Sequence, residues 1–128
     1  MESIYTESAP RPAGHYSQAI THQGIVYVSG QLPVNPATSV KKFGSIEEQT
    51  RQVLENLEAI LKASGSDSQH VLRTTVYVSD IELWPRVNKE YADFFKGHQP
   101  ARTVVPTRDL HYGFLIELDA IAAQIIHE

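Results

Sequence analysis

The stretch that decides the fold is residues 45–65, SIEEQTRQVLENLEAILKASG, which carries the signals of an amphipathic helix. It opens on a capping box, in which the Ser45 hydroxyl can accept from the Glu48 amide while the Glu48 side chain reaches back. Apolar residues then recur at helical spacing on one face, namely Ile46, Val53, Leu54, Leu57, Ile60 and Leu61. Gly65 supplies the residue type that commonly ends a helix. We therefore expect one face of this helix to be buried against a second layer.

The segments before this helix have the pattern of a hairpin. A loop with two prolines occupies residues 8–14. Strands are predicted at residues 16–20 and 25–28, because β-branched and aromatic residues flank the turn His22-Gln23-Gly24. Residues 33–44 contain Pro, Asn and Gly and predict a long loop that leads to the helix.

The segments after the helix continue the alternation of strand and helix. A buried strand is predicted at residues 71–78, followed by a second capping box from Ser79 to Glu82. The helix beyond it must hold Pro85 in its first turn, and Pro100 follows its end. Two further strands are predicted at residues 102–105 and 114–126. The order β-β-α-β-α-β-β predicts a two-layer α+β domain.

The last predicted strand is apolar on both of its faces. Ile116, Leu118 and Ala120 lie on one face, and Leu115 and Ile121 lie on the other. A single layer of helices covers only one face of a sheet. We therefore expect a homo-oligomer in which sheet faces pack together, with coverage by loops as the alternative.

Length and composition narrow the classes of protein. The 128 residues predict one domain, residues 1–128, and 11 Lys and Arg against 15 Asp and Glu give a net charge of -4. That charge argues against a dedicated nucleic-acid binder. The absence of cysteine excludes disulfides, thiolate nucleophiles and Cys-ligated metals. No stretch approaches the roughly 20 apolar residues of a membrane span, and no secretory signal pattern begins the chain, so we expect a cytoplasmic protein.

The six histidines stand in no metal-binding arrangement, and no phosphate-binding loop or nucleophile elbow occurs. We therefore expect no metal and no nucleotide cofactor. The segment Gly14-His15-Tyr16-Ser17-Gln18 could line a cleft or simply begin a strand. We expect Trp84 to pack in the core rather than to line a binding site.

Three charged residues are candidates for chemistry. Glu117 and Asp119 point to the same side of an apolar strand, where unpaired charge is costly. They either act on a substrate, or form a structural ion pair, or lie at a solvated rim. Arg102 either holds a substrate carboxylate in its planar fork or forms a salt bridge, with Glu117 as one candidate partner.

Seven segments, in order over nearly the whole chain, resemble the Rid family, also called the YjgF or endoribonuclease L-PSP family. They are GHYSQA at 14–19, VSGQLP at 28–33, EQTRQVLENL at 48–57, TTVYVSD at 74–80, VNKEY at 87–91, PAR at 100–102 and IELDAIA at 116–122. Each segment is weakly specific alone, and the ordered set is highly specific.

The resemblance implies a chorismate-mutase-like fold and a homotrimer with sheet faces packed inward and a site at each subunit interface. It implies hydrolytic deamination of 2-enamino and 2-imino acids of the 2-aminoacrylate type, as by a 2-iminobutanoate/2-iminopropanoate deaminase, without a cofactor. Arg102 matches the family's carboxylate-binding arginine, and Glu117 matches the glutamate associated with the hydrolytic water. The matched pocket positions are Tyr16, Ser29, Trp84, Asn88 and Val104.

Two departures from the family pattern bear on substrate preference. His15 stands where the family motif has proline, and Leu110-His111-Tyr112-Gly113 replaces a common Leu-Pro-Lys-Gly. Two rival functions are an endoribonuclease or translation inhibitor and a non-catalytic ligand-binding or chaperone-like trimer. The net charge and the lack of an RNA-binding motif weigh against the first. The presence of Arg102 and Glu117 favours an enzyme over the second.

Overall fold

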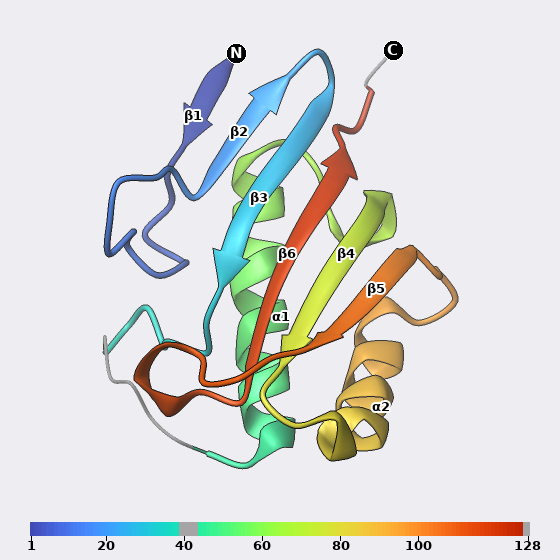
Figure 1. Ribbon diagram of the computed structural model, residues 1–128. Helices are drawn as coiled ribbons and strands as arrows, with labels where there is room; N and C mark the ends of the chain where they lie inside the picture. The colour runs from blue at the N-terminus through green and yellow to red at the C-terminus, as the bar shows by residue number, and fades with distance from the viewer. Residues whose placement is uncertain (39–43, 127–128) are drawn as a thin grey trace.

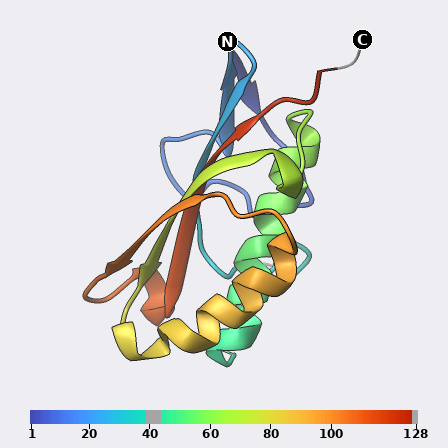
Figure 2. The same cartoon turned by 90° about the vertical axis from the view of Figure 1, so that its right-hand side faces the viewer.

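A six-stranded sheet forms one layer of the protein and two long helices form the other (Figure 1). The computed structural model describes residues 1–38 and 44–126. The sheet order is β1-β2-β3-β6-β4-β5, and only β4 and β5 run parallel. Figure 2 shows both helices on the same side of the sheet. The elements are β1 Glu2–Ile4, β2 Ala19–His22, β3 Ile25–Gln31, α1 Ile46–Ala63, β4 Val71–Val78, α2 Trp84–Phe95, β5 Ala101–Pro106 and β6 Ile116–Ala123.

The expected α+β architecture and its element order are confirmed, with one strand added at the beginning. Strand β1 has only three residues and pairs with β2 at the edge of the sheet. Helix α1 begins as the capping box predicts, because the Ser45 hydroxyl accepts from the Glu48 amide at 3.1 Å. The Glu48 carboxylate meets the Ser45 hydroxyl at 3.3 Å. Gly65 follows the helix with φ +77°, as a left-handed end requires.

The approach to α2 differs from the prediction. The cap is Asp80, whose Oδ1 accepts from the Glu82 amide at 2.9 Å at the start of a single-turn helix, η2 (Ile81–Leu83). The Ser79 amide instead donates to the carbonyl of Leu115 at 3.1 Å, so the proposed second capping box is wrong. Pro85 lies in the first turn of α2, as expected.

Several strand boundaries also differ from the prediction. Strand β2 begins at Ala19 rather than at residue 16, because residues 14–18 form a bend. Strand β6 ends at Ala123, because the amide of Ile125 donates to the Gly65 carbonyl beyond α1 and draws the chain away from the sheet. Of the predicted loop at 33–44, residues 39–43 lie outside the described residues.

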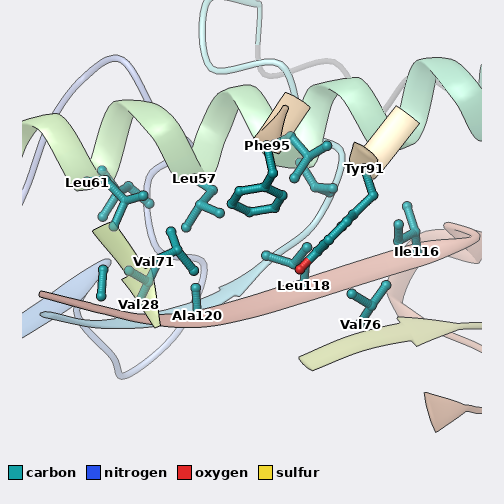
Figure 3. Packing of buried hydrophobic residues seen from close by; sticks show 14 of the residues in the cluster. Val28, Leu57, Leu61, Val71, Val76, Tyr91, Phe95, Ile116, Leu118 and Ala120 are labelled. Carbon is teal, nitrogen blue, oxygen red and sulfur yellow. The ribbon is translucent and has the colours of Figure 1, made fainter. Parts of the chain in front are cut away.

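The core lies between the helices and one face of the sheet (Figure 3). Leu57 and Leu61 of α1 pack over this face, and the rings of Tyr91 and Phe95 from α2 lie 4.6 Å apart. The Tyr91 hydroxyl reaches the Thr74 hydroxyl of β4 at 2.7 Å, so the polar end of the ring is paired inside the core.

The other face of the sheet has no helix on it. The side chains of Tyr77, Glu117, Asp119 and Ile121 are partly buried there, and Tyr27 is 47 % exposed. Strand alternation accounts for this division, because each of these residues follows or precedes a buried core residue. We call this surface the open face.

Candidate functional site

Arg102 faces the helix layer at the edge of the sheet. It lies beside Thr74 in the β4–β5 register, and Thr74 is buried on the core side. The guanidinium carbon is 4.6 Å from the ring centroid of Trp84 and 5.0 Å from that of Tyr91. Its Nη1 donates to Asn88 Oδ1 at 2.9 Å. These contacts fix the orientation of the planar, permanently charged guanidinium group, and Arg102 remains exposed.

The groove beside this arginine has a volume of about 430 Å³. Asn88, Tyr91 and Arg102 line it together with Lys96 and His98. Val104 lies two residues beyond Arg102 on the same face of β5 and packs partly against the core. The predicted residues Arg102, Trp84, Asn88 and Val104 thus gather at one place, which can accept a carboxylate.

Glu117 lies on the open face of β6, beside Tyr77 of β4. On its other side is Gly30 of β3, at an irregularity in register between Val28 and Gln31. A Cβ atom on Gly30 would overlap the Glu117 carboxylate and lie 3.2 Å from its Cδ. Glycine is therefore what allows the carboxylate to rest against β3. The sequence did not predict this role, because the expected strand ended at residue 28, whereas β3 continues to Gln31.

The surroundings of Glu117 favour its protonated form. Burial raises the pKa of the Glu117 carboxyl, the charge of His111 opposes this rise, and the charge of Asp119 adds to it. Burial likewise raises the pKa of Asp119, although the Tyr77 hydroxyl donates to its Oδ2 at 3.3 Å and favours ionisation. A carboxyl whose pKa is raised in this way is a stronger proton acceptor, once ionised, than an ordinary carboxylate.

Tyr16 and Ser29 lie at the β2–β3 side of the fold, with Gly30. The Ser29 hydroxyl donates to the Ser17 carbonyl at 2.6 Å, and the Tyr16 hydroxyl accepts from the Ala13 amide at 3.3 Å. Tyr16 and Gly30 both line a cleft of about 600 Å³. Residues 14–18 were expected either to line a cleft or to begin a strand, and the geometry supports the first alternative.

Arg102 and Glu117 belong to opposite faces of the sheet. Arg102 lies beside Thr74 and Glu117 beside Tyr77, and these two residues of β4 point to different sides. Within the described residues, Arg102 forms no ion pair with any carboxylate, so the alternative of a salt bridge with Glu117 is wrong. One chain thus holds two separate half-sites.

Three buried amide side chains hold the loops around the 600 Å³ cleft. Gln18 accepts from the Thr6 amide at 2.7 Å and donates to the carbonyls of Thr6, Ala9 and Pro10. Asn56 of α1 donates to the carbonyls of Leu32 and Val34 at 3.2 and 3.0 Å. Gln49 of α1 donates to the Gly44 carbonyl and accepts from the Leu115 amide at 2.8 Å. All three lie in segments that carry the family resemblance, but the sequence alone predicts no role for their side chains.

Two further searches of the described residues bear on the classes of function. They contain no group of three or more His, Asp or Glu side chains that could hold a metal ion. None of their helices is both long enough and apolar enough to cross a membrane.

Comparison with known proteins gives matches over almost the whole chain. The family model described as endoribonuclease L-PSP matches residues 6–124. A RutC family protein of Pyrococcus horikoshii is 44 % identical over 121 residues, which cover 94 % of this chain and 96 % of that protein. The 2-iminobutanoate/2-iminopropanoate deaminase of Rattus norvegicus is 40 % identical over 121 residues, with coverage of 94 % and 88 %.

Solved structures agree with these matches. RidA from the Antarctic bacterium Psychrobacter superposes with a TM-score of 0.92 at 32 % identity, covering 96 % of this chain and 99 % of that one. E. coli TdcF with bound serine superposes with a TM-score of 0.93 at 31 % identity, covering 98 % and 100 %. From the ordered motifs, the fold and these matches together, the chain belongs to the Rid family, known also as the YjgF, RutC or endoribonuclease L-PSP family.

Proposed function

We propose that this protein hydrolyses 2-imino acids to 2-oxo acids and ammonia, at sites completed between neighbouring chains. The observation that carries the proposal is the arrangement of Arg102 at an exposed groove. Its guanidinium donates to Asn88 and lies against the rings of Trp84 and Tyr91, which fix its orientation. Such a fork is suited to a planar carboxylate. The name of the rat relative supports the reaction class.

In the proposed mechanism, Arg102 binds the substrate carboxylate and so fixes the imine carbon. Glu117 accepts a proton from a water molecule, and the water oxygen forms a bond to that carbon. The carbon–nitrogen double bond becomes single, and the nitrogen takes up the proton that Glu117 had accepted, which gives a neutral carbinolamine. Glu117 then accepts the hydroxyl proton and passes it to the amino group as the carbon–nitrogen bond breaks. Ammonia leaves, the 2-oxo acid remains, and Glu117 is again ionised. The mechanism draws on no cofactor.

The two half-sites of one chain support a site between subunits. Arg102 faces the helix layer while Glu117 lies on the open face, so a single chain cannot present both to one small molecule. A homotrimer that packs its open faces inward would bring the β5 edge of one chain toward the Glu117 side of the next. The half-exposed Tyr27 on the open face would then be covered.

The first test is Arg102→Ala. We expect it to abolish the acceleration of 2-iminopropanoate hydrolysis while the protein keeps its fold, because Arg102 is exposed. An amino-acid oxidase generates the imine, and semicarbazide competes for it, so the protein's effect appears as lost semicarbazone. Arg108→Ala is the matched control, since it removes the same charge from another exposed site. Wild-type acceleration in Arg102→Ala would refute the assignment.

The same assay separates the enzyme from a non-catalytic binder. A protein that only binds small ligands would bind 2-oxo acids in calorimetry without changing the yield of semicarbazone. Light scattering on the wild-type protein tests the trimer independently, and a monomer that still hydrolyses the imine would refute the shared site.

A further inference from the structure

Three exposed tyrosines converge on the 600 Å³ cleft. Tyr5, Tyr16 and Tyr112 are 52 %, 50 % and 44 % exposed, and all three line it. Tyr112 is far from Tyr5 and Tyr16 in the sequence, so it is the fold that brings it to the same cleft. Leu32 and Val34 add apolar surface to the same cleft. Glu7, Arg11, Gln18 and Gln31 line it as well, so its lining is both apolar and polar. A concave space of this size is typical of a site for a small organic molecule.

Tyr112 occupies a backbone conformation that a bulky side chain rarely adopts. Its φ is 60° and its ψ is 14°, within a single-turn helix, η3 (His111–Gly113). Residues in this left-handed region are usually glycine or asparagine, because a Cβ atom is crowded there. The Tyr112 ring is held edge-on to the buried ring of Phe114, with centroids 6.0 Å apart. A strained backbone carrying a fixed ring suggests a function for the ring.

The cleft extends to the residue that lies next to the proposed catalytic carboxylate. Gly30 lines the cleft, and the same residue lies directly against the Glu117 carboxylate. Tyr16, which the sequence matches to a pocket position, lines the cleft as well. A substrate whose imine carbon lies near Glu117 could therefore extend its side chain into this cleft.

We propose that the cleft receives the substrate's side chain and that the preferred substrates are 2-imino acids with an aromatic ring. This inference rests on the proposed function. The methyl group of 2-iminopropanoate would leave most of the cleft filled with water. A planar ring can pack edge-on or offset against Tyr16 and Tyr112, which are the favourable arrangements of aromatic pairs. The reaction itself is unchanged, since the ring takes no part in it.

The test compares two imines and three variants. An amino-acid oxidase generates 2-iminopropanoate from alanine and 2-imino-3-phenylpropanoate from phenylalanine, and competition with semicarbazide gives kcat/KM for each. We expect the wild-type protein to favour the phenyl substrate by about tenfold or more, as an apolar pocket discriminates when it is filled. Tyr112→Gly should bring the ratio of the two kcat/KM values toward one, because it removes a ring that the phenyl group would contact. Tyr112→Phe should retain the preference, because it keeps the ring.

Glycine is chosen because it suits the left-handed conformation of residue 112, so the variant should melt no lower than a control. Leu72→Ala is that control, since Leu72 is also exposed and does not line the cleft. A wild-type protein that accelerates both imines equally, or prefers the methyl substrate, overturns the inference and leaves the proposed function intact. Acceleration of neither imine overturns both. A change of oligomeric state in Tyr112→Gly would mean that a neighbouring subunit occupies the cleft, which also overturns the inference.

Discussion

Replacing Gly30 by alanine tests whether catalysis depends on the position of the Glu117 carboxylate. The added Cβ would overlap one carboxylate oxygen and lie 3.2 Å from Cδ and 3.5 Å from Cγ of Glu117. The carboxylate would have to move by roughly 1 Å to restore van der Waals separation. A displacement of this size at a reacting group costs on the order of 10²-fold in rate, which corresponds to about 2.7 kcal/mol in the activation barrier.

The fold should tolerate this change. Gly30 is not among the residues with positive φ, so its backbone accepts alanine without strain. Alanine also reduces the freedom of the unfolded chain, which contributes about 0.4–1 kcal/mol toward stability at compatible sites. The Glu117 side chain can rotate away, so the melting temperature should change little while the rate falls.

The assay is the semicarbazide competition with 2-iminopropanoate, with thermal unfolding measured on the same samples. Gly97→Ala is the matched control, because a Cβ atom at Gly97 meets nothing within 4 Å. It should keep both the wild-type rate and the wild-type melting temperature. If Gly30→Ala kept the wild-type kcat/KM, the position of the Glu117 carboxylate would not limit catalysis, and its assignment as the proton acceptor would fail.

Two further predictions concern the pKa of Glu117 and the hydrogen bonds of Asn56. In the pH–rate profile, kcat/KM should fall on the acid side as Glu117 takes up a proton, at an apparent pKa above that of an ordinary glutamate, because burial raises the pKa of this carboxyl. Asp119→Asn should move this acid limb to lower pH, because the charge of Asp119 raises the pKa of Glu117. If the limb does not move, it reports the titration of a group other than Glu117. Asn56→Ala should lower the free energy of unfolding by about 1–3 kcal/mol in urea denaturation, because the partly buried carbonyls of Leu32 and Val34 lose their donor. An unchanged midpoint would mean that water replaces the amide.

Helix α1 could be predicted closely because its signals are local. Its cap at Ser45, its apolar stripe and its end at Gly65 all lie within the helix or at most two residues from it. Strand β1 could not be predicted, because three residues are too few for a periodic pattern and their pairing partner lies in β2.

The candidate site was predictable in residue types but not in arrangement. Resemblance pointed to Arg102 and Glu117, yet only the register of β4, β5 and β6 shows that they belong to opposite faces. The contact of Gly30 with Glu117 depends on an irregularity in the β3–β6 register, and this irregularity cannot be predicted from the spacing of residues in the sequence. Gln49 bonds to Leu115 across 66 positions, and such long-range bonds leave no local pattern.

The three buried amides have a consequence for how the protein can diverge. Around the cleft, Gln18, Asn56 and Gln49 bond to main-chain atoms of the loops and to none of the loops' side chains. The path of each loop is therefore insensitive to which side chains it carries, apart from prolines that would remove a bonded amide. Mutations at positions such as Tyr5 and Tyr112 can then alter what the cleft accepts at little cost in stability. Substitutions at these positions can in this way change substrate preference during evolution, while Gln18, Gln49 and Asn56 keep the loop backbone in place.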